Sequence, residues 1–349
     1  MRGEKLDFFK MKSESEYKWI PKNGVSLEAI ERMQKHFQKP KYAMGEAWFI
    51  GKERRLYTEL IDKHFAEIEP SELSTNVLFE IASGTSCFGH REEWDQWFKY
   101  LLPQLILRCQ EFNFFNELLA QSVVTAFMSI YWNGISDEYK GFRNDVINTL
   151  SLCLMNENLW FDYLDEKTKT IQLRAFFLDT YKDGNDQLRL DWNTGKANES
   201  LSALMFFCLK YLNPEEISFW TKSLFAIDDI YWKGALMVWL LGAYDVLEKP
   251  IVVPSIIEKS NPEISWKNSH VLGSRYGSID AEHPTAEEYN DNKDFLPTKN
   301  SRCFLIEIRK KMTDDLILDW AESFAQDKFV AESTSNVPEL LMDKLSKNK

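Results

Sequence analysis

Apolar residues recur every three or four positions along most of this chain, which is the spacing of an amphipathic α-helix. The first such stripe runs from Leu27 to Phe37, and Ser26 precedes it as a candidate N-cap. Segment 231–247 is apolar on all sides, which is typical of a helix in the middle of a protein body. The pattern predicts helices over about 27–39, 51–67, 70–82, 92–102, 116–132, 137–155, 159–181, 201–212, 214–226, 231–247, 302–312, 314–327 and 337–346.

Several stretches interrupt this pattern. Residues 83–90 hold two glycines and small polar side chains, and residues 182–200 are polar, so we expect surface loops at both places. Pro103 is expected at a junction between helices. From 249 to 300 the periodicity is lost and five of the 11 prolines occur. An irregular segment of that length is uncommon inside a compact domain and is either functional or mobile.

A short internal similarity bears on how the helices pack. Residues 92–101 and 215–224 are identical at five of ten positions, including Trp97 and Trp220. Repetition of a helical unit is typical of stacks in which no unit buries its apolar face alone. The chain also has only 14 Gly and 11 Pro, fewer than an all-β fold with many tight turns normally needs. We therefore predict an all-α fold of antiparallel helix pairs, arranged as an irregular, HEAT-like helical repeat stack.

These patterns divide the chain into four parts. Residues 1–24 are charged and weakly patterned, and are expected to be an N-terminal arm. Residues 25–248 are expected to be the main helical domain, and 249–300 an irregular, proline-containing insertion. Residues 301–349 are expected to be C-terminal helices that pack on the main domain.

The charge of the chain is unevenly placed. The net charge is −12, but residues 1–55 carry 13 Lys or Arg and 8 Asp or Glu, so the remainder is strongly acidic. An acidic body repels nucleic-acid phosphates, so nucleic-acid binding is disfavoured. Either the acidic surface serves solubility alone, or it matches a basic protein partner and speeds association by electrostatic steering.

The sequence contains no expected membrane span or secretory signal. Its first residues are of mixed charge and lack an apolar core segment. The apolar stretch 118–136 is interrupted by polar residues such as Gln121, and 230–247 carries Lys233 and Asp245, so both read as buried helices. The five cysteines are widely spaced, which favours small core residues in a reducing compartment over disulfides. We therefore expect a cytoplasmic protein.

Two motifs contain residue types that metal or thiol chemistry uses. Cys87 and His90 form a Cys-x-x-His pair, but zinc usually needs a second such pair, and a thiol nucleophile needs a third orienting group. Asp228-Asp229 invites comparison with the Asp-Asp-x-x-Asp motif of terpene synthases, but Trp232 stands where the last carboxylate belongs. We interpret the Asp pair as a helix cap and expect no metal or cofactor.

The main alternative is a catalytic one. Helical toroid glycosidases line their cavities with tryptophans and use paired acids. Here the acids would be Glu92, Glu93 and Asp95, beside Trp94 and Trp97. Acids at a helix start are more often caps, and Trp at helical spacing is more often core.

Composition and charge favour a non-catalytic function. We expect a cytoplasmic scaffold or inhibitor that binds a protein partner, plausibly a basic one, and an immunity-type protein that neutralises a basic toxin is one concrete version. Its oligomeric state is not determined by the sequence. The expected partner-binding residues are the acids of the irregular insertion: Asp280, Glu282, Glu287, Glu288, Asp291 and Asp294.

Overall fold

The computed structural model describes residues 19, 24–41, 69–83, 91–110, 114–155, 163–165, 170–172, 180–182, 188–190, 199–249 and 296–346. Over these residues the fold is all-α, as predicted. The helices are α2 (Leu27–His36), α4 (Thr75–Ser83), α5 (Arg91–Arg108), α6 (Phe114–Ile130), α7 (Phe142–Ile147), α8 (Glu199–Tyr211), α9 (Pro214–Ala226), α10 (Ile230–Glu248), α14 (Thr298–Lys311), α15 (Asp314–Phe324), α16 (Lys328–Ser333) and α17 (Val337–Ser346), with 3-10 turns η2 (Pro70–Glu72) and η5 (Leu150–Met155).

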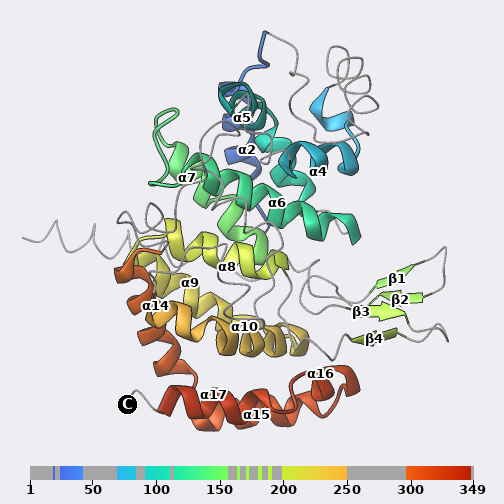
Figure 1. Cartoon of the computed structure of the whole chain (residues 1–349), viewed down its shortest axis with the longest axis vertical. Helices are drawn as coiled ribbons and strands as arrows, with labels where there is room; N and C mark the ends of the chain where they lie inside the picture. Colours follow the sequence, from blue (N-terminus) through green and yellow to red (C-terminus); the bar gives the residue numbers. More distant parts are fainter. Residues whose placement is uncertain are drawn as a thin grey trace, which may run out of the picture.

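The helices follow one another along the longest axis of the molecule (Figure 1). Helices α2, α4 and α5 lie at one end, and α6 packs between α4 and α8. Helices α9, α10 and α14 form the next level, and α10 contacts α15, α16 and α17 at the other end. Among the helices described, none is both long enough and apolar enough to cross a lipid bilayer.

One hydrophobic core connects all these levels. It extends from Trp19 to Leu345, and helix α10 lies inside it with Trp232 and Trp239 fully buried. The ring of Trp239 contacts Phe206 of α8 edge-on at 5.5 Å. Because an apolar helix can bury all its sides only inside a body, the prediction for 231–247 is confirmed.

Local capping signals explain several helix starts. Ser26 accepts a hydrogen bond from the Ala29 amide, and Asp229 accepts one from the Trp232 amide at 2.9 Å, so both predicted caps are confirmed. Asn213 and Glu216 form a reciprocal capping box, and Pro214 occupies the first turn of α9. The remaining acid of the Asp pair, Asp228, pairs with Lys233, which lowers the pKa of its carboxyl group.

Three details of the predicted helices are wrong. Leu27 is 64% exposed, so the apolar stripe of α2 begins with Ala29 and Ile30. Pro103 lies inside α5 rather than at a junction. Its missing N–H removes one helical hydrogen bond, but the flanking Leu101, Leu102 and Leu105 are fully buried and hold the helix together. The predicted helix 137–155 is divided into α7 and η5.

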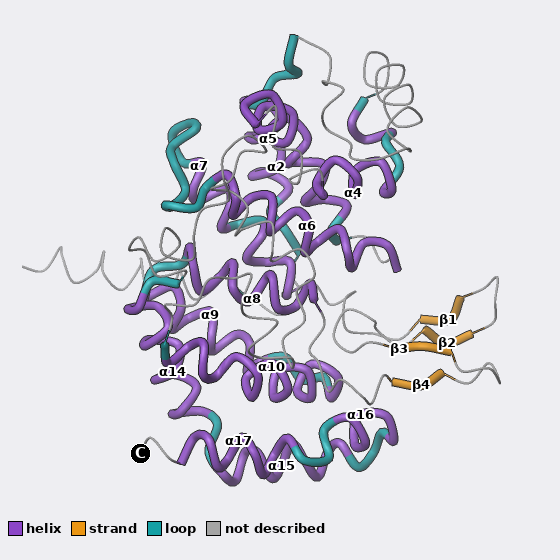
Figure 2. The backbone as a smooth tube through the Cα atoms, viewed as in Figure 1, coloured by secondary structure: helices purple, strands orange, loops and turns teal. Residues whose placement is uncertain are grey.

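The helix predicted over 159–181 is also wrong. Residues Tyr163–Asp165 (β1) pair antiparallel with Thr170–Gln172 (β2), and Thr180–Lys182 (β3) pair with Leu188–Leu190 (β4). These short strands lie to one side of the helices (Figure 2). They are rich in Thr, Tyr, Leu and Ile, and β-branched and aromatic residues favour strands. Strand β4 also occupies part of the predicted loop 182–200, and α16 was not predicted.

Candidate binding pocket

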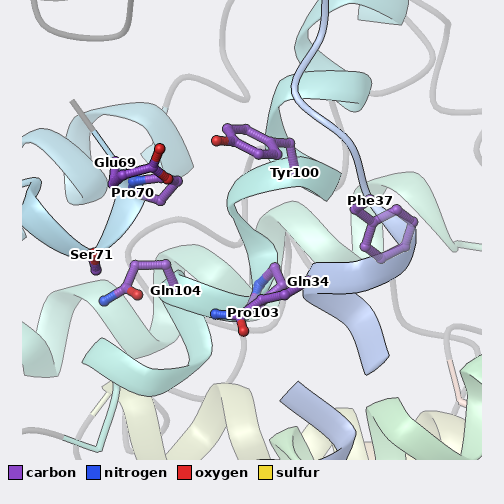
Figure 3. A pocket seen from close by; sticks show the side chains of 8 residues that line it. All are labelled: Gln34, Phe37, Glu69, Pro70, Ser71, Tyr100, Pro103 and Gln104. Carbon is purple, nitrogen blue, oxygen red and sulfur yellow. The ribbon is translucent and has the colours of Figure 1, made fainter. Parts of the chain in front are cut away.

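A pocket of about 310 Å³ opens between the last turn of α2, the 3-10 turn η2 and the middle of α5 (Figure 3). Four of its side chains are rings and four are polar. The volume lies at the lower end of the range for small-molecule sites, so it suits one long side chain or one small group. The lining residues are Gln34, Phe37, Glu69, Pro70, Ser71, Tyr100, Pro103 and Gln104.

The carboxamide of Gln104 is the most informative group in this pocket. The residue is only 8% exposed, and within the part of the chain that the structure describes its side chain has no hydrogen-bond partner. A carboxamide offers both donors and an acceptor, and the side-chain nitrogen and oxygen of Gln104 are not among the enclosed polar atoms of the described structure, so they are open to the cavity. A ligand that forms hydrogen bonds with this carboxamide would replace the water that it otherwise meets.

Tyr100 and Glu69 face each other across the mouth of the pocket. The Tyr100 hydroxyl is directed toward the Glu69 carboxylate in Figure 3. Burial raises the pKa of Tyr100, and the negative charge of Glu69 raises this pKa further. The edge of Trp97 packs against the Tyr100 ring at 5.8 Å and orients it. Glu69 precedes η2 but does not cap it, so its carboxylate is available.

The α2 wall is held in place by an ion pair with a buried carboxylate. Asp145 of α7 accepts hydrogen bonds from Arg32 Nε at 3.0 Å and Nη2 at 2.6 Å. The Tyr139 hydroxyl donates to the same carboxylate at 2.7 Å. Phe37 packs edge-on against Phe142 at 5.5 Å. These contacts fix the last turn of α2, from which Gln34 and Phe37 reach the pocket.

The chain before α2 and the opposite wall are also held by specific bonds. The Trp19 indole donates to Ser151 Oγ at 2.8 Å, and the Val25 amide donates to Gln110 Oε1 at 3.1 Å. On the other wall, Arg108 Nη2 donates to the Ser71 carbonyl oxygen at 2.9 Å, which ties η2 to α5. Specific hydrogen bonds therefore hold the elements on both sides of the pocket in place.

A second polar cluster lies along α5, away from the pocket lining. Lys99 Nζ and the Tyr131 hydroxyl both donate to Glu138 Oε1, at 2.7 and 3.0 Å. Burial and the Glu138 carboxylate raise the pKa of Tyr131, and the charge of Asp95 adds to this effect. Of the acids predicted for the catalytic alternative, Asp95 is thus placed beside Tyr131, while the side chains of Glu92 and Glu93 are outside the described structure.

Three buried or half-buried carboxylates of this half of the molecule join separate elements of the fold, and one of them, Glu138, lies in the loop between α6 and α7. Glu138 binds Lys99, and Asp145 binds Arg32. Glu216 pairs with Arg143 at 2.6 Å, and the same arginine donates to the Tyr211 carbonyl oxygen. Each of these acids therefore has a structural partner and does not point into the pocket.

The cysteines that the structure describes are not activated. Cys109, Cys153 and Cys208 are buried in the core, as predicted, and burial raises the pKa of each thiol, to about 12 for Cys153. Thiols with raised pKa values are poor nucleophiles. Among the described residues, no three His, Cys, Asp or Glu side chains gather closely enough to hold a metal ion. Cys87 and His90 lie outside the described residues.

The pocket was not predicted from the sequence. Its deepest polar group, Gln104, follows Pro103 in a helix that is buried on most sides, and this gave no local signal of a site. The six predicted partner-binding acids of 280–294 lie outside the described residues, and the assignment of 249–300 stays a prediction.

Neither a protein-family model, nor a curated protein, nor a solved structure matches this chain.

Proposed function

We propose that this protein is a non-catalytic scaffold or inhibitor that binds a protein partner in the cytoplasm, and that the pocket between α2, η2 and α5 receives one side chain of that partner. The observation that carries this proposal is the carboxamide of Gln104, which has no partner among the described residues and opens into a cavity walled by rings. Protein interfaces concentrate their binding energy where one anchoring side chain fills such a desolvated pocket.

The charge of the surface supports a basic partner. The last level of the stack exposes two leucines, Leu318 and Leu340, among acids that form no ion pair with any described residue. Together with the net charge of −12, these acids would steer a basic protein toward the molecule. The exposed acids are Asp314, Asp315, Asp319 and Glu322 of α15 and Glu339 and Asp343 of α17.

An immunity-type inhibitor of a basic toxin is a concrete version of this function, and it rests on analogy of class alone. The HEAT-like repeat interpretation belongs to the same proposal. Equivalent positions of the two similar segments, Trp97 and Trp220, are both buried and are each the seventh residue of their helix, which supports it. A repeat stack presents an extended surface to a partner.

The catalytic alternative receives less support. A glycosidase needs two carboxyl groups that converge on a substrate cavity. The charge of Asp95 acts on Tyr131, which bonds to Glu138, and the described side chains of the pocket lining include a single acid, Glu69.

The test is site-specific photo-crosslinking in the native cell. A photoreactive residue at the exposed position Gln34, on the rim of the pocket, should crosslink to one protein partner, whereas the same residue at Lys328 of α16 should not. The purified partner should then bind Gln104→Ala at least about tenfold more weakly than the parent chain. A partner that binds the parent and Gln104→Ala equally well would contradict the proposal.

The predicted contribution of the insertion can be tested with the same partner. Replacing Asp280, Glu282, Glu287, Glu288, Asp291 and Asp294 by their amides should slow association by about tenfold at low salt and weaken its salt dependence, with a smaller effect on dissociation. Equal association rates for the parent and this variant would remove the insertion from the binding site.

A further inference from the structure

The pocket also indicates which side chain it would take, if the proposed protein-binding function is correct. We propose that it binds an arginine of the partner. The argument uses the apolar walls, the distribution of acceptors and the charge of the lining residues.

The walls match the stem of a long side chain. Phe37, Pro70 and Pro103 present apolar surface, and Figure 3 shows their rings around the same space as the Tyr100 ring. Arginine and lysine bury their methylene stems against such surface while the charged head reaches polar groups. A short polar side chain would leave these rings uncovered.

The polar groups of the pocket match a side-chain head group that donates hydrogen bonds and accepts none. A guanidinium has five N–H donors and no acceptor. The Glu69 carboxylate, the Gln104 carboxamide oxygen and the Ser71 hydroxyl all supply acceptors. Among the described side chains that line the pocket, Glu69 is also the only ionisable acid or base apart from the Tyr100 phenol. The lining therefore carries one negative charge, which disfavours an anionic ligand.

Arg108, which bonds to Ser71 beside the pocket, does not fill this role. Arg108 donates to the Ser71 carbonyl oxygen, and it does not line the pocket. The Tyr100 ring adds a preference for a planar cation, because a guanidinium can stack on an aromatic face as well as form bidentate hydrogen bonds. A lysine ammonium group is positively charged but not planar, and the head group of citrulline is planar but uncharged.

The experiment measures binding of N-acetyl-arginine amide to the full chain by saturation-transfer NMR, with N-acetyl-citrulline amide and N-acetyl-lysine amide as matched probes. The arginine probe should bind most tightly. Glu69→Gln should lower the affinity for the arginine probe by about tenfold, to a value close to the affinity for the citrulline probe, because the charged hydrogen bond is then lost. Gln104→Leu should lower the affinities for the arginine and citrulline probes by similar factors.

Glu332→Gln is the control variant, because it removes an exposed acid of α16 by the same chemical change. It should leave all three affinities unchanged, and circular dichroism should show that each variant keeps the helical fold. Binding of the arginine probe that is unaffected by both Glu69→Gln and Gln104→Leu would overturn the inference. Equal binding of the arginine and lysine probes would also overturn it.

The two proposals can fail separately. If a partner crosslinks at position 34 and depends on Gln104, but the arginine probe does not bind, then the arginine inference is wrong and the protein-binding function stands. If the arginine probe binds in the pocket but no protein partner depends on Gln104, then the arginine site stands and the protein-binding function is wrong.

Discussion

Two carboxamide residues of low exposure, Asn300 and Gln104, have opposite surroundings. Asn300 of α14 is 4% exposed, and its Nδ2 donates to the Leu209 and Leu212 carbonyl oxygens at 2.8 and 2.6 Å. Gln104 of α5 is buried to a similar extent, but its carboxamide faces a cavity and has no partner among the described residues.

The difference separates a structural group from one that is available to a ligand. The last carbonyl groups of a helix have no hydrogen-bond donor within that helix. The Asn300 side chain donates to such carbonyl groups at the end of α8. Gln104 has the same chemistry and a similarly low exposure as a whole residue, so neither property distinguishes a binding group from a packing group. The presence or absence of a hydrogen-bond partner, and the opening of the carboxamide to a cavity, do.

The largest loss of stability should come from a substitution in the packed region around Asn300. Trp239 contacts Phe206 and Phe304, which lie on α8 and α14. Because it is fully buried, Trp239→Ala should lower the free energy of unfolding by about 3–5 kcal/mol. Urea denaturation measures this value. Tyr100→Ala, at the half-buried pocket wall, should cost less than about 2 kcal/mol. A Trp239→Ala change below about 1 kcal/mol would show that this region is not tightly packed.

The two carboxamides themselves give the matched comparison. Asn300→Leu should destabilise the fold by about 2–3 kcal/mol, because two hydrogen bonds are lost and the α8 carbonyl groups stay buried. Gln104→Leu should change the free energy of unfolding by less than about 0.5 kcal/mol, since no hydrogen bond is lost and an apolar group is better suited to burial. Equal destabilisation by both substitutions would mean that Gln104 is structural.

The smallest expected effect is on the ionisation of the Tyr100 phenol in the pocket. Burial and the Glu69 charge raise the pKa of Tyr100 above its ordinary value of 10.0. The folded state then holds the phenol proton more tightly than the unfolded state, so this residue lowers stability as the pH rises above 10. Glu69→Gln should shift the pKa of Tyr100 downward, by less than about one unit. Ultraviolet titration of the parent and of Glu69→Gln, each compared with its Tyr100→Phe derivative, measures the shift. An unchanged pKa would place Glu69 away from the phenol.

The helices were predictable wherever the signal was local. Asn213 and Asp229 cap α9 and α10 by bonds to residues three positions later, and the apolar surface of α10 is visible in its own sequence. Pro103 and the residues of strands β1 to β4 were mispredicted, because packing against other segments decides whether a proline is tolerated and whether a short stretch pairs as a strand.

The pocket depends on contacts that no local pattern reports. It brings Glu69 to Ser71 together with Tyr100 and Gln104, which lie about thirty residues later in the chain. The bond from Arg108 to the Ser71 carbonyl oxygen fixes this arrangement. The sequence could indicate that Gln104 belongs to a largely buried helix, but not that a cavity lies beside it.

Arg309 of α14 donates to the Tyr244 hydroxyl at 2.6 Å and to Glu248 at 3.1 Å, so the end of α10 lies beside the last turns of α14. The chain must therefore return along α14 to reach Thr298, a path of roughly 17 Å at 1.5 Å per helical residue. About six extended residues cover that distance. The intervening segment, 250–295, is several times longer than this connection needs. A connection of about six residues would therefore be long enough to leave the contact of Arg309 with Tyr244 and Glu248 in place.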